Sequence, residues 1–359
     1  MPRFYRASHF ISHPASLDSY RRTRSHVRNH SMTSRPLEGP ASTQRPKHEP
    51  NPPGSGHLHL TSSSSRASFS TLLASYPLKL LTPAPLPSQP PNVAACYVLA
   101  YGGGLVAGDL VSLRVTVDEG CGLVLLTQGS TKIFKHRPGI RPLSHHSTRD
   151  DFSSVTRQRM HVTLAPRSFL LLLPDSASPF RGSRYAQAQR FVLDRSASVL
   201  VLDWVNSGRG QRPTRDPNDV EKGGEAEQEV WAMESYDSLN EIHLSGRLIM
   251  RDRLFLDNAS SPVAPRMGPY NVYANILILG PHLARLLKHL DELANRTRQF
   301  QVQRPPEVIW AFSPVEDGRG GVLRVAGVEV EDVRKWIRGT MEDCGVKELV
   351  GEGLWPRII

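Results

Sequence analysis

Residues 101–135, YGGGLVAGDLVSLRVTVDEGCGLVLLTQGSTKIFK, decide the fold class of this chain. Within them, apolar residues alternate with polar ones from Leu113 to Val117, which is the period-two pattern of a strand with one buried face. Polar, glycine-rich turns flank this segment at residues 102–109 and 128–132. The stretch therefore predicts short strands joined by tight turns that hold polar groups at the surface.

The first glycine block formally fits the dinucleotide fingerprint G-x-G-x-x-[G/A] at Gly102, Gly104 and Ala107. That fingerprint requires a following helix, because the helix N-terminus holds the pyrophosphate. The residues after Asp109 alternate as a strand instead, and the second block at 128–132 lacks P-loop spacing. We therefore interpret both blocks as turns. A nucleotide- or phosphate-binding enzyme that uses the turn from Gly102 to Asp109 stays open as an alternative function.

The net charge of +10 on this 359-residue chain is concentrated at the N-terminus. Residues 1–70 contain ten Lys and Arg against three Asp and Glu, and the remainder is close to balance. A nucleic-acid-binding body would need basic residues gathered on a folded face, so nucleic acid is not an expected partner. Residues 1–70 are rich in Ser, Arg and Pro without apolar periodicity, which predicts a disordered tail.

The expected location is cytoplasmic, without a membrane partner. No apolar run reaches the ~18 to 20 residues that span a bilayer. The three cysteines, Cys96, Cys121 and Cys344, show no C-x-x-C spacing, which fits a reducing compartment. Two alternatives for the basic tail stay open. It resembles an organellar targeting segment in being rich in Arg and Ser, and it has the composition of a tail that binds acidic partners or nucleic acid.

The body, residues 71–359, is predicted to be mainly β. Apolar or alternating segments recur every eight to twelve residues between turn formers, which is typical of layered antiparallel sheets. Two amphipathic helices are predicted in the C-terminal half, at 282–298 and 331–344. Polar insertions at about 137–156 and 210–228 are predicted to be flexible surface loops.

No catalytic constellation is present, so the chain is not expected to be an enzyme. The G-x-S-x-G and H-E-x-x-H motifs are both missing. Ser130 and Lys132 are two residues apart, but this spacing does not define a nucleophile and its base, and Ser130 is interpreted as a turn residue. The pair His145-His146 has imidazoles suited to nickel, although adjacent histidines in a polar loop are more often only solvated.

The two glycine blocks resemble the UreD (UreH) family of urease accessory proteins, whose members carry YGGGLVxGD followed by QGSTK. The resemblance extends from about residue 76 to 256 and includes LPDxxxPF from Leu173, Asp203-Trp204, Gly208-Arg209 and Glu229-x-Trp231. The site residues that carry it are Gly102, Gly103, Gly104, Gly108, Gln128, Gly129, Ser130, Lys132, Asp175, Pro179, Phe180, Arg209 and Trp231. The long N-terminus and the insertions resemble eukaryotic, fungal-type members.

The resemblance implies a two-layer sheet architecture wound in a helical sense, with two helices. It also implies a scaffold that binds apo-urease together with UreF-type and UreG-type partners, and that carries nickel in transit without a tightly bound cofactor. A relay needs weak, exchangeable ligands such as carboxylates. Asp109 and Glu229 are therefore the candidate ligands of a nickel path. Glu225 and Glu227 are alternatives for the place of Glu229, because an insertion precedes it.

Overall fold

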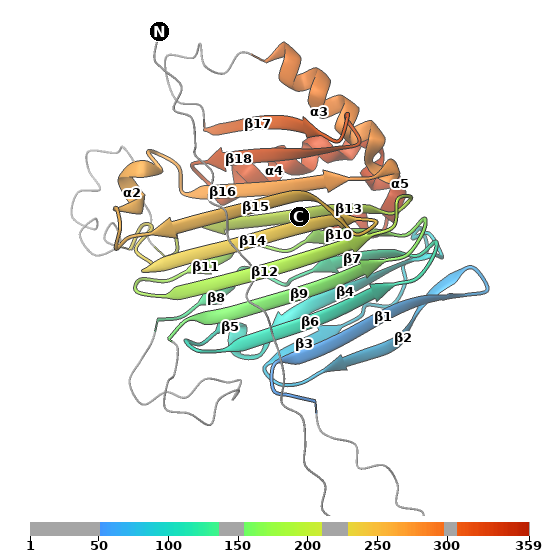
Figure 1. The fold of residues 1–359 in the computed structure, drawn as a ribbon, viewed down its shortest axis with the longest axis horizontal. Helices are drawn as coiled ribbons and strands as arrows, with labels where there is room; N and C mark the ends of the chain where they lie inside the picture. The colour runs from blue at the N-terminus through green and yellow to red at the C-terminus, as the bar shows by residue number, and fades with distance from the viewer. Residues whose placement is uncertain (1–50, 136–153, 210–228, 298–306, 359) are drawn as a thin grey trace, which may run out of the picture. The chain divides into compact units, whose positions relative to one another are not determined.

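The folded chain winds repeatedly between two β-sheets that face each other (Figure 1). The structure is a computed structural model, and it describes residues 51–135, 154–209, 229–297 and 307–358. The first sheet has seven strands and the second has eleven. Both counts are of strands in these described residues.

The strands of the first sheet, in spatial order, are β15 (Arg247–Asp257), β14 (Ser235–Leu244), β12 (Arg184–Leu193), β9 (Thr156–Leu164), β6 (Leu110–Val117), β1 (Ser55–Ser63) and β2 (Arg66–Ala74). Those of the second sheet are β17 (Val308–Val315), β18 (Gly320–Gly327), β16 (Val272–Leu279), β13 (Ser198–Asn206), β10 (Phe169–Leu173), β7 (Gly122–Leu126), β4 (Val93–Ala100) and β3 (Leu78–Leu81). Three short strands, β5 (Gly104–Leu105), β8 (Thr131–Ile133) and β11 (Ala177–Pro179), pair beside this second series.

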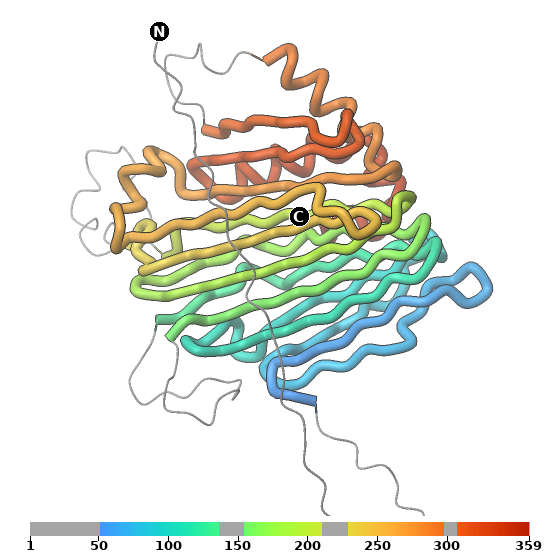
Figure 2. The backbone as a smooth tube through the Cα atoms, viewed as in Figure 1, coloured from blue at the N-terminus to red at the C-terminus, as the bar shows by residue number. Residues whose placement is uncertain are grey.

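In the middle of the described chain, from β6 to β13, the longer strands alternate between the two sheets. Thus β6, β9 and β12 belong to the first sheet, and β7, β10 and β13 belong to the second. We call each turn of this winding a coil. Each coil places its strands beside the equivalent strands of the preceding coil, as the tube in Figure 2 shows. The pairing is parallel, so that Val115, Val162 and Phe191 form one row across the first sheet. This is the helical winding that the resemblance implies.

The structure confirms a mainly β protein with layered sheets and two longer helices in its C-terminal half. The expected antiparallel pairing is wrong for the centre of both sheets, where β6–β9–β12–β14 and β4–β7–β10–β13 pair in parallel. Antiparallel pairs lie toward the margins, for example β1–β2 and β17–β18. The reason is that the spacing of turns in the sequence indicates how long the strands are but not in which direction neighbouring strands pair. A chain that returns through a second sheet has the same turn spacing as a hairpin.

The apolar core has two layers, one between the sheets and one behind the second sheet. In a first-sheet strand such as β6 every second residue is buried, because only one face is covered. All five residues of β10 are buried, because the second sheet is covered on both faces. The buried run FLLLL of β10 therefore reflects its central position.

Among the described residues, the helices α3, α4 and α5 pack behind the second sheet, whereas Val263 of α2 packs into the core between the sheets. The α-helices are α2 (Val263–Arg266), α3 (Ala284–Arg296), α4 (Val330–Met341) and α5 (Lys347–Val350), with 3-10 turns at Tyr101–Gly103, Pro281–Leu283 and Trp355–Arg357 and a π-turn at Glu342–Val346. The leucines of α3 at 286, 287 and 290 are buried on one face, which confirms the predicted amphipathic stripe. Within the described ranges, no helix has both the length and the apolar character needed to cross a bilayer.

The first two strands correct the predicted boundary of the tail at residue 70. β1 and β2 belong to the first sheet, and Leu58 and Leu60 of β1 are fully buried. The alternating pattern was hidden because His57 and His59 occupy the outward positions on either side of Leu58. Residues 1–50 lie outside the described residues, as do 136–153 and 210–228, which hold nearly all of the predicted insertions. The segment predicted as a loop up to 156 ends earlier, since Thr156 begins β9.

Replacing Leu58 with Ala is expected to lower the free energy of unfolding by about 2–5 kcal/mol, because it removes buried methyl groups and leaves a cavity. Leu73→Ala is the matched control, since this side chain of β2 is 46% exposed. The control should stay within about 0.5 kcal/mol of the unsubstituted protein. Urea unfolding followed by circular dichroism measures both values. Equal losses in the two variants would contradict the place of β1 in the core.

Candidate functional site

The motif residues lie where successive coils cross from the second sheet to the first. We call these crossings the first to fourth corners. Their described residues are 101–109, 127–135, 174–183, and 207–209 together with 229–234. Because the coils stack in parallel, motif blocks that are far apart in the sequence become neighbours at one end of the domain.

The first three corners join through the short strands β5, β8 and β11. Gly104 lies opposite Lys132, and Lys132 lies opposite Ser178. A Cβ atom at residue 104 would lie 2.5 Å from the backbone oxygen of Lys132, so this close approach requires glycine. The backbone N–H of Phe134 also donates to the oxygen of Leu105 at 3.0 Å. The YGGG and QGSTK blocks therefore form one continuous backbone surface.

The third and fourth corners meet just as closely. Gly208 has a φ of +94°, and a Cβ atom there would lie 2.5 Å from the backbone oxygen of Pro179. The guanidinium of Arg209 lies 5.3 Å from the centre of the Phe180 ring. Phe180 in turn meets the ring of Phe134 edge-on at 5.3 Å. This stack of Phe134, Phe180 and Arg209 links the second, third and fourth corners.

Trp231 anchors the return of the fourth corner. Its side chain is buried, and its indole N–H donates to the backbone oxygen of Tyr270 at 2.9 Å. Its backbone N–H donates to the oxygen of Ser207 at 2.8 Å. The φ of Trp231 is +53°, a value that bulky side chains rarely adopt. Packing of the indole therefore holds the backbone in an unfavourable conformation.

Asp175 ties the second corner to a helix behind the second sheet. Its Oδ2 accepts a 2.8 Å hydrogen bond from the N–H of Gly129, and its own N–H donates to Thr127 Oγ1 at 2.8 Å. Its Oδ1 forms a 2.8 Å ion pair with Arg334 of α4. Sequence reasoning missed Arg334, which lies in the part of the chain where the resemblance is weak.

The remaining motif residues form the turns themselves. Gly102, Gly103 and Gly108 all have positive φ, and β6 begins directly afterwards at Leu110. This confirms the predicted strand after the glycine block. Gln128 and Lys132 expose their side chains, whereas Ser130 is half-buried.

The two carboxylates predicted for a nickel path stand at different corners. Asp109 is fully buried at the first corner, where its Oδ2 accepts a 2.8 Å hydrogen bond from the N–H of Val106. That bond caps the turn into β6. Glu229 is half-buried at the fourth corner, and its carboxylate lies 3.7 Å from the guanidinium of Arg209. The second and third corners separate them.

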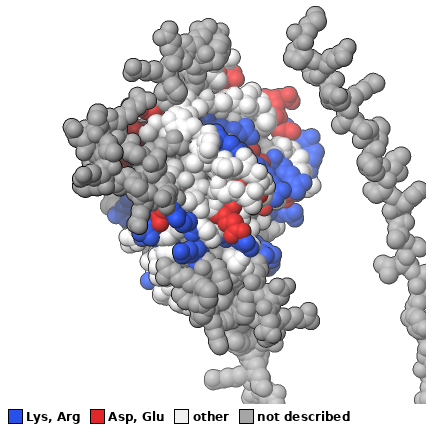
Figure 3. Space-filling view, turned by 90° about the vertical axis from the view of Figure 1, so that its left-hand side faces the viewer, with Lys and Arg blue, Asp and Glu red and all other residues white. Residues whose placement is uncertain are grey.

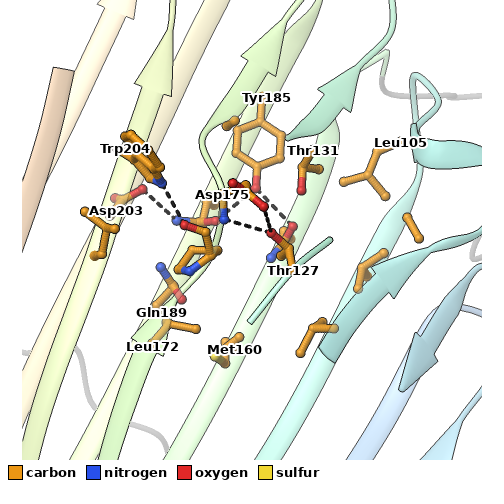
Figure 4. Close-up of a pocket in the computed structure, with 18 of the residues that line it drawn as sticks. Leu105, Thr127, Thr131, Met160, Leu172, Asp175, Tyr185, Gln189, Asp203 and Trp204 are labelled. Atoms are coloured by element: carbon orange, nitrogen blue, oxygen red, sulfur yellow. Dashed lines mark hydrogen bonds between the residues drawn. The ribbon is translucent and has the colours of Figure 1, made fainter. Parts of the chain in front are cut away.

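A cavity of about 80 Å³ lies between the sheets beside the first three corners (Figure 4). Leu105, Thr131 and Ala177 line it from these corners, and Tyr185 and Asp203 line it from β12 and β13. At ~30 Å³ per water molecule, the cavity holds roughly two or three waters. Its lining is mainly apolar, and the side chains of Gln158, Gln187 and Asp203 are among the polar groups that interrupt it.

Asp203 is the ionisable centre of this lining. It lies in the buried run SVLVLDWVN of β13 and is 8% exposed. Its carboxylate accepts hydrogen bonds from Ser238 Oγ at 2.5 Å, Asn240 Nδ2 at 2.6 Å and Gln187 Nε2 at 3.3 Å. Burial raises the pKa of Asp203 above its ordinary value, and these hydrogen bonds oppose that shift. A single carboxylate inside an apolar strand was the signal that sequence reasoning passed over.

Polar groups continue from Asp203 toward the surface. Asn275 of β16 lies opposite Asp203, and its Nδ2 donates to Asp252 of β15. Asp252 also forms a 2.6 Å ion pair with Arg324, whose side chain is 43% exposed. Asn275 Oδ1 is buried without a hydrogen-bond partner among the described residues. We call Asp203, Asn275 and Asp252 the polar lane.

The lane does not amount to a closed metal cage. Across the described residues, no three His, Cys, Asp or Glu side chains group closely enough to hold a metal ion. Figure 3 looks onto the end of the domain where the corners lie. Positive and negative side chains are interspersed there with neutral ones on the described surface. The polar lane therefore offers separate oxygen ligands instead of one closed site.

One protein family and several known proteins match most of this chain. The family described as UreD urease accessory protein matches residues 53–216 and 218–358. Urease accessory protein 4 of Cryptococcus neoformans var. grubii is 56% identical over 327 residues, which cover 86% of this chain and 97% of that protein. Urease accessory protein UreD of Sorangium cellulosum is 32% identical over 325 residues, covering 86% and 91%. Urease accessory protein D of Oryza sativa subsp. japonica is 29% identical over 294 residues, covering 76% and 85%.

The family match includes both sheets, the described parts of all four corners and every member of the polar lane. The glycine blocks that suggested the resemblance are thus part of a match along nearly the whole folded chain. This chain belongs to the UreD family of urease accessory proteins.

Proposed function

We propose that this protein acts in urease maturation as a non-catalytic scaffold that binds apo-urease together with UreF-type and UreG-type partners. Nickel is its cargo, which passes through the protein toward the urease active site and is not a resident cofactor. Family membership supports the maturation role. The free, buried cysteines Cys96, Cys121 and Cys344 fit work in the reducing cytoplasm.

The polar lane is the observation that carries the nickel step. A dication that leaves water needs oxygen ligands along its route, because uncompensated burial of charge is costly. Asp203 and Asp252 provide carboxylates, and the Oδ1 atom of Asn275 provides a buried acceptor between them. Carboxylate and amide oxygens hold nickel more weakly than imidazole or thiolate does. Exchange along such ligands moves an ion without trapping it.

Asp109 and Glu229 belong to the same proposal as outlying path ligands. Asp109 immediately precedes β6, whose Val111 lines the cavity. Glu229 stands at the rim of the fourth corner beside Arg209. Asp109 also caps its turn, so its replacement has a structural cost that the replacement of Glu229 lacks.

The alternative of a nucleotide- or phosphate-binding enzyme gains no support from the fold. A phosphate site at the first glycine block needs a helix N-terminus directly after the glycines. The strand β6 occupies that place. The alternative of a basic-tail interaction protein concerns residues outside the described ranges.

Co-expression of apo-urease and the UreF-type and UreG-type partners, with and without this chain, tests the proposed function. We expect nickel-loaded, active urease only when the chain is present. Asp203→Asn should lower the nickel content of urease several-fold while leaving complex formation on size exclusion unchanged, because it removes one path carboxylate with little change in volume. Glu229→Ala should act in the same direction more weakly, and Asp109→Ala should also destabilise the fold by about 1 kcal/mol.

Asp291→Asn on α3 is the matched control, because it removes an exposed carboxylate on a helix that packs behind the second sheet. It should leave nickel content unchanged. Full nickel loading without the chain would refute the maturation role. Full loading with Asp203→Asn, Glu229→Ala and Asp109→Ala would refute the path and leave the scaffold role standing.

The pH dependence of stability tests the burial of Asp203. Because its folded pKa lies above the ordinary 3.8, the folded protein keeps a proton that the unfolded chain releases. The stabilisation from this group is therefore full below 3.8 and is lost as the pH rises through the folded pKa. Urea unfolding gives the free energy of unfolding of the unsubstituted protein and of Asp203→Asn at each pH. As the pH rises through the folded pKa, the unsubstituted protein should lose stability relative to the variant. A pH-independent difference would contradict the raised pKa.

A further inference from the structure

The outer face of the first sheet is rich in arginine and has no part in the cavity or the polar lane. Side chains alternate across this sheet, so the odd-numbered residues of β9 from Arg157 to Thr163 point away from the second sheet. The parallel register aligns Arg114, His161 and Arg190 in one row across three strands. We call six outward arginines of the sheet the arginine face, which leaves out Arg184 and Arg247 at strand ends, because these pair with Glu234 and Glu316. They are Arg114, Arg157, Arg159, Arg190, Arg251 and Arg253.

Only half of these charges are balanced locally. Arg190 and Arg251 share Glu241, at 3.0 and 3.3 Å, and Arg253 pairs with Asp237 at 2.7 Å. Within the described ranges, no ion pair reaches the other three members, which are Arg114, Arg157 and Arg159.

The three unpaired arginines are close to one another. Arg157 and Arg159 are two residues apart on β9, about 7 Å along the strand. Arg114 lies on the neighbouring strand β6, opposite His161. Burial lowers the pKa of His161, and the charges of Arg190 and Arg114 lower it further, which agrees with a positive potential at this place.

A shallow groove runs beside them. It has a volume of about 260 Å³, and Ala186 and Ala188 on β12 form its floor, where their short side chains leave space between the flanking longer ones. Arg157 and Arg159 stand on one side, and Arg253 stands on the other. No described helix covers this sheet, whose strands run across the front of the domain in Figure 1. The face is therefore open, grooved and positively charged.

We propose that the arginine face docks an acidic segment of a partner protein. The segment lies extended in the groove and sets alternate Asp or Glu side chains, about 7 Å apart, against Arg157 and Arg159. A third carboxylate reaches Arg114. Fork-shaped guanidinium groups bind carboxylates through two hydrogen bonds, so the contact has a defined geometry in addition to its charge attraction.

A nucleic acid fits the same face less well. Asp237 and Glu241 stand among the arginines and would repel a continuous phosphate backbone. The ring of Phe255, at the margin of the face, is already occupied by the guanidinium of Arg253 at 5.2 Å. Base stacking needs a free aromatic surface. A protein segment with separated carboxylates avoids both conflicts.

Fluorescence anisotropy of a labelled peptide of alternating Glu and Ser, titrated with the full chain, tests the proposal. The triple variant Arg114→Gln, Arg157→Gln, Arg159→Gln should bind the peptide at least about 10-fold more weakly, because it loses three charge-assisted hydrogen-bonded contacts at once. Replacing the same three arginines with Lys should restore part of the affinity, since charge remains and the fork is lost. Added salt should weaken binding to the unsubstituted chain.

The matched control changes the same charge elsewhere, through Arg21→Gln, Arg22→Gln and Arg24→Gln in the N-terminal segment. It should bind the peptide nearly as well as the unsubstituted chain. Melting curves check folding, and the single exposed change Arg159→Gln replaces the triple variant if that variant unfolds. An equal loss in the control, or no loss in the face variants, would overturn the proposal. So would tighter binding of duplex DNA or of phosphatidylserine vesicles through the same three arginines.

Discussion

Every other feature of the structure depends on the parallel stacking of successive coils around an apolar layer that both sheets share. The row Val115, Val162, Phe191 shows how this works, because each residue faces the second sheet from an equivalent position in its own coil. A slip of one residue between two coils would turn such a row toward solvent and bury the arginines beside it. Burial of the apolar rows therefore fixes the register of all coils together.

Register in turn brings the corners together. Gly104 against Lys132 and Gly208 against Pro179 are contacts between corners, and they exist only while neighbouring coils stay aligned. The same alignment places Asp203 next to donors from two first-sheet strands, β12 and β14. A buried carboxylate held by neutral donors is generally less stable than an apolar residue of similar volume. The cost of burying Asp203 agrees with the proposal that it is a ligand of the nickel path.

The sequence predicted those features that depend on local pattern. The glycine turns, the strand after Asp109 and the amphipathic helix at 284–296 each follow from a few neighbouring residues. The direction of strand pairing did not follow, because a return through a second sheet leaves no local trace. β1 was missed because His57 and His59 made its alternating pattern resemble a polar tail.

The candidate site was predictable only in part, for the same reason. The four corners were found as motif blocks, but their contact with one another depends on the stacking of coils. Arg334 lies 159 residues from Asp175 in the chain, and the two meet only through the packing of α4 on the second sheet. The polar lane likewise joins β13, β15 and β16, which share no local sequence signal.

Disulfide trapping on the outer face of the first sheet tests the parallel register most directly. Thr163 lies opposite Val192 in the parallel pair β9–β12, whereas an antiparallel pair of the same strands would place Thr163 opposite Ala186. The native cysteines are buried, so engineered thiols react first. Parallel pairing predicts rapid cross-linking of Thr163→Cys with Val192→Cys under mild oxidation and none of Thr163→Cys with Ala186→Cys, which stand ~20 Å apart in that pairing. The opposite result would contradict it.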